Sequence, residues 1–441
     1  MANDVIKVGE YIVIQKQNYK KLHKYNKSDS MVNIGKCSVN LSGIEGCRNF
    51  SVFKMIAEGT KRNKQYSLEL TNEAVELKDE IDVKTSGIDN RNILDDGRSQ
   101  KLTAEEINEL KSDSIKASEI VESLITNSST FHAKTEFSQA KYLKKKEKKY
   151  FEYVQILKPN LRLITEILYK LDPGKVQNIR IDTLSQMISY CNVNSEGIHL
   201  LYDSGSSGLL AAAMLSAVGR NTTGKLVHMH PGNMSQKQAL LAMNFDSEQL
   251  ERCVSVNVYS ALRQYYQGSD IHTTTAPAEI NGSSTESLKR KGPELNQEGK
   301  VQKLEDSTDM STDSKEIEEK LSEDKQQTER KKPKWHYDNI AASELLSQKV
   351  DSLVIACKED PENIFNELCT FVKPGRPFVI YYNVVEPLQN LYVTLKSQTN
   401  VAALKITCNW MRNYQILPER THPEVTMNSS GGFLLTGYIL K

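Results

Sequence analysis

The stretch Gly197-Ile-His-Leu-Leu-Tyr202, followed by Asp203-Ser-Gly-Ser-Ser-Gly208, decides the fold class of this chain. The first half is apolar enough for a buried strand, the second half is a turn rich in glycine and serine, and an alanine-rich helix is predicted from Leu209 to Val218. A strand, a tight turn and a helix in this order are typical of a Rossmann-type site, where glycine lets the backbone approach a cofactor. We therefore predict an α/β domain with a Rossmann-like sheet.

The turn itself is a degenerate version of such a site. Only two glycines remain in it, Gly205 and Gly208, and bulkier Ser207 and Leu209 stand where methyltransferases commonly carry glycine. Side chains at these two positions are expected to crowd a bound methyl donor. The residues predict a methyltransferase fold in which the turn that begins at Asp203 binds no cofactor.

The next predicted strand, Lys225-Leu-Val-His-Met229, should lead to an acid that binds the ribose hydroxyls of a nucleoside, about 20 residues after the turn. Asp and Glu are absent between Asp203 and Asp246, so this acid is missing. His228 and His230 could face one side of the strand as metal ligands, but the sequence offers no third ligand, and we predict no metal site.

A second place for chemistry is the end of the predicted strand Ser352-Leu-Val-Ile-Ala356. Many base methyltransferases carry an acid and a proline there, whereas this chain reads Cys357-Lys-Glu-Asp-Pro361. Glu359 or Asp360 could act as an acid or base, but the expected role is that of an acid in the first turn of a helix, where the helix dipole favours it. We predict no catalytic residue.

Composition and charge limit the class of protein. The 441 residues carry a net charge of +1 and are 38% hydrophobic, and we expect an intracellular protein of two or three domains. No apolar stretch approaches the roughly 18 residues of a membrane span, and the N-terminus does not resemble a secretory signal. The 7 cysteines include no CxxC pair, so neither a zinc site nor a disulfide framework is predicted.

Three domains are predicted along the chain. Residues 1–88 contain short strand-like segments and predict a small β-barrel-like domain, which could be an RNA-binding appendage or a subunit interface. Residues 89–178 are predicted as a helical connector, and residues 179–441 as the Rossmann-like domain. A segment without Phe, Trp or Tyr, residues 267–334, interrupts this last domain and is predicted to be disordered.

Two basic clusters in the insertion, Lys289-Arg-Lys291 and Arg330-Lys-Lys-Pro-Lys334, are compatible with import into the nucleus. They could equally balance the acidic run between Glu305 and Asp324. The nucleus is the location that we expect.

The helical connector carries the highest local charge. Thr103 and Glu106 form a capping-box pattern, and a second helix, beginning near Thr135 and extending to Val154, contains Tyr142-Leu-Lys-Lys-Lys-Glu-Lys-Lys149. Such a run can be a solvated helix face. Aromatic and amide residues lie among these lysines, however, and phosphate contacts combined with stacking side chains are typical of RNA binding, which we favour.

Four irregular motifs carry a resemblance to a known family. They are Asp89-Asn-Arg-Asn-Ile-Leu-Asp-Asp96 with Gln100-Lys-Leu102, the basic helix from Phe131 to Tyr150, Arg180-Ile-Asp-Thr-Leu-Ser-Gln186, and Trp410-Met-Arg-Asn-Tyr-Gln-Ile-Leu-Pro-Glu-Arg-Thr-His-Pro423. In these motifs the chain resembles the non-catalytic subunit of the eukaryotic tRNA (adenine-58-N1)-methyltransferase. The resemblance is weak in the N-terminal strands and in the insertion.

The resemblance implies a catalytic partner subunit that binds S-adenosylmethionine, a two-plus-two heterotetramer, and tRNA as the ligand. The chain itself would bind no cofactor and would supply tRNA-binding surface. The residues that the resemblance assigns to tRNA binding are Asn90, Arg91, Asn92, Gln100, Lys101, Lys134, Gln139, Lys141, Tyr142, Lys144, Lys145, Lys146, Arg180, Asp182, Thr183, Arg412, Tyr414, Gln415, Arg420, Thr421 and His422. Arg180 and Asp182 could instead form only an ion pair that caps a helix.

Two other functions share parts of this pattern. The chain could be an active S-adenosylmethionine-dependent RNA methyltransferase with an unusual donor loop, or a tRNA-binding translation initiation factor without modification activity. The missing ribose acid and the expected crowding of the turn favour the catalytically silent subunit over the active enzyme.

Overall fold

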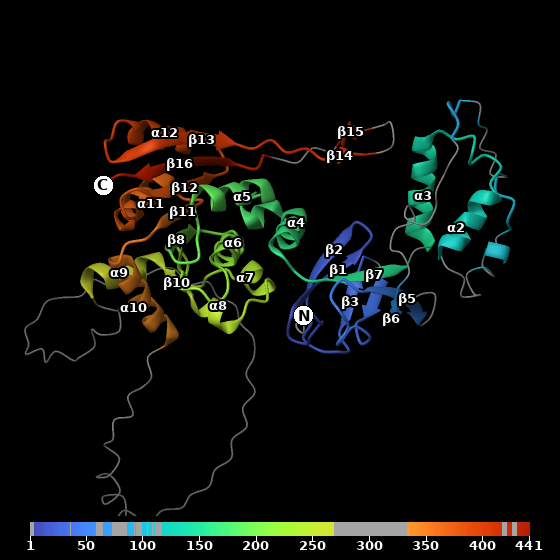
Figure 1. Cartoon of the computed structure of the whole chain (residues 1–441), viewed down its shortest axis with the longest axis horizontal. Coiled ribbons are helices and arrows are strands. Elements are labelled where there is room, and N and C mark those ends of the chain that lie inside the picture. The colour runs from blue at the N-terminus through green and yellow to red at the C-terminus, as the bar shows by residue number, and fades with distance from the viewer. Residues whose placement is uncertain are drawn as a thin grey trace, which may run out of the picture.

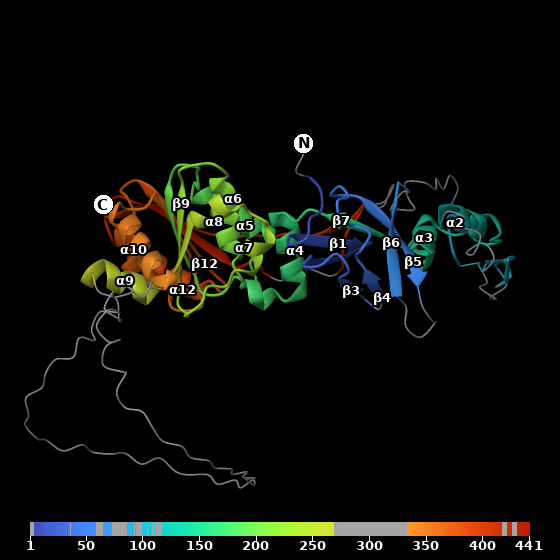
Figure 2. The same ribbon diagram turned by 90° about the horizontal axis from the view of Figure 1, so that it is seen from below.

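The computed structural model of the chain describes residues 4–35, 37–58, 65–72, 86–91, 93, 99–103, 105–107, 110, 117–150, 152–268, 333–416, 421–425 and 430–441. Figures 1 and 2 show three parts in a row: the C-terminal α/β domain, the N-terminal sheet and a helical unit at the far end. Among the described residues, no helix combines the length and the apolar character that crossing a bilayer requires. The 7 cysteines all fall within the described residues and are unpaired.

The C-terminal domain is built on a sheet with the strand order β10-β9-β8-β11-β12-β16-β13. Its strands are β8 (Ile198–Asp203), β9 (Lys225–His230), β10 (Cys253–Asn257), β11 (Ser352–Ala356), β12 (Arg376–Tyr382), β13 (Val401–Cys408) and β16 (Phe433–Ile439). β8 to β12 run parallel, while β16 pairs antiparallel with both β12 and β13. The strand order reverses between β8 and β11, as in doubly wound folds, and this confirms the predicted Rossmann-like fold.

Helices cover both faces of this sheet. The helices are α4 (Leu161–Leu171), α5 (Ile181–Tyr190), α6 (Leu209–Val218) and α7 (Gln238–Ala242) over one face, and α9 (Val258–Gln267), α10 (Lys334–Ser347), α11 (Pro361–Leu368) and α12 (Glu386–Lys396) over the other. Along β8, Leu200 and Tyr202 face the second group, whereas Leu201 faces the first. Parallel strands buried on both faces form continuous apolar runs, which is why the sequence predicts them well.

The insertion interrupts the C-terminal domain. α9 and α10, which flank it, pack against each other, and β10 and β11 on its two sides belong to the same sheet. Residues 269–332 lie outside the described residues. Most of the segment predicted to be disordered falls there, with the whole first basic cluster and all of the second except Pro333 and Lys334.

The N-terminal sheet wraps around an apolar core that includes Ile12, Phe53 and Val154, and this confirms the barrel-like domain. Its strand order is β2-β1-β7-β5-β6-β4-β3. The strands are β1 (Tyr11–Lys16), β2 (Tyr19–Lys24), β3 (Met31–Ile34), β4 (Cys37–Asn40), β5 (Val52–Glu58), β6 (Gln65–Thr71) and β7 (Tyr153–Leu157). The lysine-rich β2 was not predicted as a strand; it lies at the sheet edge, where lysines are tolerated because one side faces solvent.

β7 corrects the predicted helix, which was extended to Val154. Helix α3 (Glu136–Tyr150) ends before β7, and Val154 is fully buried in the N-terminal core between β1 and β5. The chain from β6 to β7 therefore forms a helical unit inserted into the barrel-like domain, not a connector that follows it. α4, assigned by the prediction to the connector, packs its Ile164 and Leu168 into the C-terminal domain.

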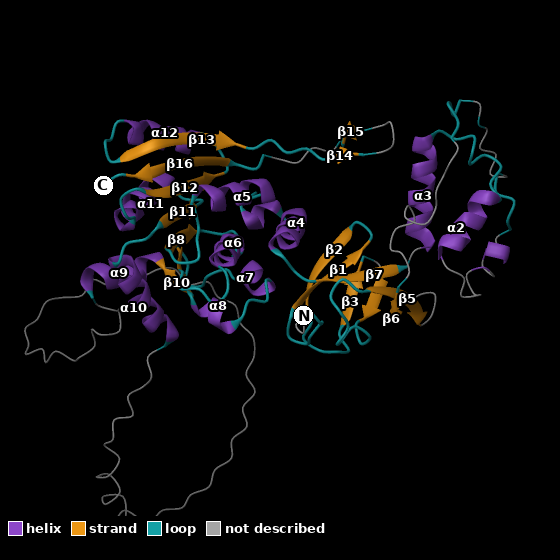
Figure 3. Cartoon of the chain, in the orientation of Figure 1, coloured by secondary structure: helices purple, strands orange, loops and turns teal. Residues whose placement is uncertain are grey.

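The helical unit contains α2 (Ala117–Thr126) and α3, which pack around Leu124 and Phe131. The capping box is confirmed, because the backbone N–H of Thr103 donates to Glu106 Oε2 at 2.8 Å and the N–H of Glu106 donates to Thr103 Oγ1 at 3.3 Å. A short hairpin of β14 (Tyr414–Gln415) and β15 (His422–Pro423) lies between β13 and β16 in the chain and extends toward the helical unit (Figure 3). We call the described residues between β13 and β16, 409–416, 421–425 and 430–432, the arm.

Candidate functional site

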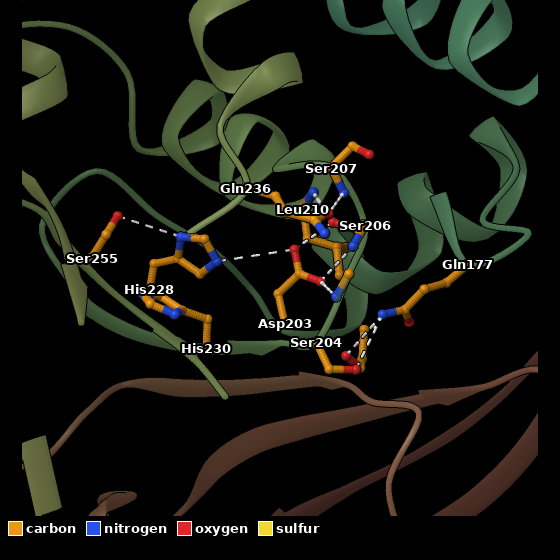
Figure 4. A network of polar contacts seen from close by, with 12 residues as sticks. Gln177, Asp203, Ser204, Ser206, Ser207, Leu210, His228, His230, Gln236 and Ser255 are labelled. Carbon is orange, nitrogen blue, oxygen red and sulfur yellow. Dashed lines mark hydrogen bonds and ion pairs between the residues drawn. The ribbon is translucent and has the colours of Figure 1, made fainter. Parts of the chain in front are cut away.

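Asp203, the last residue of β8, closes the turn that leads into α6 (Figure 4). Its Oδ1 accepts hydrogen bonds from the backbone N–H groups of Gly205 and Ser206 at 2.9 and 2.8 Å, and the Ser206 hydroxyl donates to its Oδ2. The side chain is buried, with 5% of the residue exposed. These two backbone amides of the turn are therefore already bound to the chain's own carboxylate.

Both glycines of the turn lie against other parts of the chain. A Cβ atom on Gly208 would stand 2.6 Å from the carbonyl oxygen of Gln236 and 3.1 Å from Cα of Lys237. A Cβ atom on Gly205 would stand 3.1 Å from Nζ of Lys358. In a cofactor site, glycine leaves room for the ligand. Here that room is taken by the segment before α7 and by a lysine side chain.

Ser207 adopts a φ of +57°, a left-handed conformation that costs a non-glycine residue roughly 1–2 kcal/mol. Its N–H donates to Gln236 Oε1 at 2.9 Å, its hydroxyl donates to the Lys175 carbonyl at 2.8 Å, and its own carbonyl accepts from the Ala239 N–H at 3.0 Å. These bonds hold the turn against two neighbouring segments. Leu209 was expected to crowd a ligand but is fully buried in the core beneath α6, so this expectation is wrong.

The end of β9 carries two histidines where an acid would be needed (Figure 4). His228 is 2% exposed, with Nε2 at 3.9 Å from Asp203 Oδ2 and Nδ1 at 3.5 Å from Ser255 Oγ. Burial lowers the pKa of His228 more than the charge of Asp203 raises it, so the ring is neutral at pH 7. His230 Nδ1 lies 2.7 Å from the Gly232 carbonyl. Within the described residues, no three potential ligands gather around a metal position.

The acids that follow β11 are used within the chain. Asp360 is the N-cap of α11, and its carboxylate accepts a hydrogen bond from the Glu362 N–H at 3.2 Å. Glu359 accepts one from the backbone N–H of Lys358 at 3.1 Å. Asp360 therefore has a structural role at a helix start, as the N-cap and not in the first turn that was predicted, and Glu359 precedes the helix.

S-adenosylmethionine does not fit these residues. The donor carries positive charge on its sulfonium and ammonium groups, and its ribose hydroxyls need an acceptor. The pocket in front of the turn is lined by Lys175, Lys237 and Lys358, and the described residues that line it include no carboxylate. Repulsion from these lysines, the covered glycines and the missing acid all oppose binding of the donor.

Helix α3 presents its lysines to solvent. Lys141, Lys144 and Lys145 are exposed, and in the described part of the chain no carboxylate lies within ion-pair distance of them. Lys146 is half-buried with Nζ 5.0 Å from the centre of the Tyr142 ring, and burial and two neighbouring lysines lower the pKa of Lys146. This unpaired positive charge can attract the phosphates of a nucleic acid.

The aromatic and amide side chains among these lysines pack within the helical unit. Tyr142 lies edge-on to Phe131, with ring centroids 5.2 Å apart, and Lys134 lies over the Tyr142 ring at 5.8 Å. Gln139 is 3% exposed, and its Nε2 donates to the Phe131 carbonyl at 3.0 Å. Gln139 therefore supports α3 from inside and is not exposed for the tRNA contact that was predicted for it.

The segment around Asn90 holds the start of α3. Asn90 Nδ2 donates to Thr135 Oγ1 at 2.9 Å and to Ser138 Oγ at 2.7 Å. The side chain of Arg91 is 89% exposed and forms an ion pair with Asp89, with 2.6 Å between Nε and Oδ2. Asn92 lies outside the described residues.

Gln100 forms a hydrogen bond within the helical unit, whereas the neighbouring Lys101 is exposed. Gln100 Nε2 donates to the carbonyl of Leu124 in α2 at 2.9 Å, so this amide joins two parts of the helical unit. Lys101 is exposed to solvent. The predicted tRNA residues of this unit are therefore of two kinds, exposed cations and polar groups that hold the unit together.

Arg180, Asp182 and Thr183 fasten the two ends of the arm. Arg180 is 4% exposed, pairs with Asp182 at 2.8 Å and donates from Nη2 to the Asn409 carbonyl at 3.0 Å. Thr183 is 1% exposed and donates from Oγ1 to the Gly431 carbonyl at 2.9 Å. Burial opposes ionisation of Asp182, but Arg180 outweighs it and lowers the pKa of this carboxyl. The expected ion pair is present, and these buried groups position the arm.

The arm carries the remaining predicted residues. Arg412 Nη2 donates to the carbonyl of Glu424 at 3.3 Å, which joins the two sides of the hairpin. Tyr414, Thr421 and His422 are exposed and Gln415 is half-buried. Arg420 lies outside the described residues.

A family profile matches most of the chain. The profile describes the Gcd10p family, and the match extends over residues 5–291. The chain belongs to the Gcd10p family. This confirms the resemblance read from the four sequence motifs.

Two relatives of this Gcd10p-family chain have the same description. A protein of Mus musculus, "tRNA (adenine(58)-N(1))-methyltransferase non-catalytic subunit TRM6", is 35% identical over 81% of this chain and 75% of its own length. A protein of Dictyostelium discoideum with the same description is 28% identical over 99% of this chain and 80% of its own length. These names describe a non-catalytic subunit, as the sequence motifs predict.

Two solved structures align with the chain at low sequence identity. An O-methyltransferase of Thermotoga maritima has a TM-score of 0.48 at 12% identity and covers 100% of this chain and 97% of its own. The tRNA (m1A58) methyltransferase TrmI of Aquifex aeolicus has a TM-score of 0.45 at 11% identity, with 99% of each chain covered. The fold assignment of the Gcd10p-family chain rests on its own strand order.

Sequence reasoning missed the residues that surround the turn. Gln236 and Lys237 follow β9 and Lys358 follows β11, two parallel strands that end at the same edge of the sheet, and Lys175 joins them from the short helix Pro173–Val176. No motif connects them. The missing acid after β9 and the loss of glycines from the turn were the signs in the sequence that this edge differs from a donor site.

Proposed function

We propose that this chain is the non-catalytic, tRNA-binding subunit of a tRNA (adenine-58-N1)-methyltransferase, in a two-plus-two heterotetramer with a catalytic subunit that binds S-adenosylmethionine. One observation carries the proposal: the two glycines of the β8–α6 turn are covered by Gln236, Lys237 and Lys358 of the same chain. The scaffold of a methyltransferase is intact, but other parts of the chain lie directly against both glycines of the turn. The names of the relatives agree with a subunit that needs a catalytic partner.

The cationic surface of α3 supports the tRNA-binding part of the proposal. Its exposed lysines have no carboxylate partners in the described residues, so their charge is available to phosphates. The arm extends toward the same side of the molecule (Figures 1 and 3). A folded tRNA presents phosphates over a long surface, and it can contact two separated cationic elements at once.

Methyl transfer to unmodified tRNA tests the division of labour. This chain alone, the partner alone and the co-purified complex are each incubated with labelled S-adenosylmethionine. We expect activity in the complex and donor binding that depends on the partner. Methyl transfer by this chain alone would make it an active enzyme. A normal level of 1-methyladenosine in cells that lack the chain would favour the translation-factor function.

We also propose that the chain acts in the nucleus, based on the basic clusters of the insertion. Alanine substitution of Lys289, Arg290 and Lys291 together with Arg330, Lys331 and Lys332 is expected to move a fluorescent fusion into the cytoplasm. Unchanged nuclear fluorescence would show that these clusters do not determine import.

A further inference from the structure

The pocket in front of the β8–α6 turn has the charge of an anion site. Its volume is about 410 Å³, and it is formed where the short helix Pro173–Val176, the turn, the start of α7 and the segment after β11 meet. Lys175, Lys237 and Lys358 line it from three of these segments, together with the amide side chain of Gln238. It lies at the carboxyl edge of the parallel strands, where doubly wound folds bind their ligands.

The three lysines are available to a ligand. All three are exposed to solvent, and none has a carboxylate within ion-pair distance in the described part of the chain. The nearest acid inside the turn, Asp203, is buried and is occupied by the Gly205 and Ser206 amides. The field of Lys237 extends inward, since its charge contributes to the lowered pKa values of His228 and His230.

The same charges that exclude a sulfonium favour a phosphate. Three ammonium groups around one pocket can each contact an oxygen of a phosphate, which carries its negative charge on several oxygens. The amides of Gly205, Ser206 and Ser207 are already bound, so the lysines supply the binding. Flexible, exposed lysines act as point charges, and the interaction should therefore depend strongly on salt.

We propose that the Lys175–Lys237–Lys358 pocket binds a phosphate group, in place of the methyl donor that the fold would otherwise hold there. The phosphate can belong to the backbone of bound RNA or to a small phosphate ligand. The RNA source rests on the proposed function, whereas the pocket chemistry does not. In the RNA case, the covered donor site serves as a third contact with tRNA, on the C-terminal domain.

The test uses the co-purified two-subunit complex. Lys175, Lys237 and Lys358 are replaced together by alanine, and tRNA affinity is measured by fluorescence anisotropy over a range of salt concentrations. The matched control replaces Lys225, Lys396 and Lys405, three exposed lysines of the same domain outside the pocket. In addition, the wild-type complex and the pocket variant are each titrated with inorganic pyrophosphate in a calorimeter.

For an RNA phosphate we expect the pocket variant to bind tRNA about 5- to 20-fold more weakly at 0.1 M salt, with a salt slope smaller by about one. The control variant should change much less, and the triple lysine-to-arginine variant should keep the affinity. For a small ligand, tRNA binding stays unchanged and pyrophosphate binding is lost in the pocket variant. The absence of both effects, with unchanged melting temperatures, would overturn the proposal. A wild-type complex that fails to bind tRNA would refute the proposed function and leave the pyrophosphate titration to decide the pocket.

Discussion

The β8–α6 turn and helix α3 use their polar groups in opposite ways. In the turn, Asp203 accepts from the amides of Gly205 and Ser206, and the three polar groups of Ser207 all have partners in the chain. On α3, exposed lysines have no carboxylate partners among the described residues. The first region uses its polar groups to hold itself together, and the second leaves its charge for a ligand.

In this chain the fold of a cofactor-binding domain is kept without the capacity to bind the cofactor. A Rossmann-like sheet still builds the edge at which a cofactor would bind, but the chain itself fills the space nearest to the glycines. The function therefore has to be inferred from the charge and exposure of particular side chains and not from the fold.

The largest effect is expected from removing the charge of α3. Replacing Lys141, Lys144, Lys145 and Lys146 with alanine should weaken tRNA binding by about 30- to 1000-fold at 0.1 M salt, because each exposed phosphate contact contributes on the order of 0.5–1 kcal/mol. The salt slope of the binding constant should fall by about three. Fluorescence anisotropy with labelled tRNA measures both quantities.

The matched control for α3 replaces the same four lysines with arginine, which preserves the charge and should preserve most of the affinity. Size-exclusion chromatography of the alanine variant with the partner should show an intact complex. Unchanged tRNA affinity of the alanine variant at moderate salt would show that α3 is not part of the tRNA-binding surface.

The next effect concerns the covered turn. Gly208→Ala should destabilise the protein by about 2–4 kcal/mol, since it combines the strain of a positive φ with contact against the Gln236 carbonyl. Gly375→Ala is the control, because Gly375 has nearly the same φ, +77° against +78°, but a Cβ atom added to it would meet no atom within 4 Å. It should cost only about 1–2 kcal/mol, the strain alone.

Urea unfolding followed by circular dichroism separates these two glycine variants. Equal losses of stability would mean that the segment before α7 does not rest on the turn in solution. In that case the donor position would be open, and the case for a silent site would lose its main support.

Much of the fold could be predicted from the sequence because its signals are local. The strands of the C-terminal sheet are apolar runs, and the Thr103–Glu106 capping box lies within a few residues of chain. β7 was mistaken for the end of a helix because its pairing partners, β1 and β5, are about a hundred or more residues away. Only tertiary contacts decide such a segment.

The candidate site was predictable in part, for the same reason. The missing acid after β9 is visible in the sequence, and so is the lysine run of α3. The buried positions of Gln139 and Thr183 are not, because polar residues are usually exposed, and their partners Phe131 and Gly431 supply backbone carbonyls that leave no sequence pattern. The burial of Leu209 was not predicted, because the sequence of α6 does not show which of its residues point into the core.

A smaller effect is expected at the root of the arm. Thr183→Val keeps the shape of the side chain but leaves the Gly431 carbonyl without its donor, at a cost of about 1–2 kcal/mol. Amide hydrogen exchange should become faster in residues 409–416 and 421–425. If the arm contacts tRNA, affinity should fall a few-fold although Thr183 is buried.

Thr183→Ser should restore slow exchange, because it returns the hydroxyl. Thr394→Val is the control, since the Thr394 hydroxyl donates to the Asn390 carbonyl within α12 and touches no part of the arm. Normal exchange in the arm of Thr183→Val would show that Arg180 and other contacts hold the root without this bond.

The smallest effect should appear in the pH dependence of stability and concerns the neutral ring beneath the turn. His228 faces Asp203, His230 and Lys237, and its pKa is lowered in the folded protein chiefly by burial. The unfolded chain therefore binds a proton near pH 6.5 that the folded chain does not, so stability should decrease as pH falls below that value until it reaches the folded pKa. Between pH 7 and 5.5, the contribution of His228 is on the order of 1 kcal/mol.

His228→Gln removes this proton, so the variant should lose less stability than the wild type over the same pH interval, in urea titrations at each pH. His422→Gln, an exposed position, controls for the loss of a histidine elsewhere. Parallel losses in wild type and His228→Gln would mean that the ring exchanges with solvent. Since His228 lies next to Asp203, water would then reach the region that the hydrogen bonds of the turn close off. The contrast between a closed turn and the exposed lysines of α3 would be smaller.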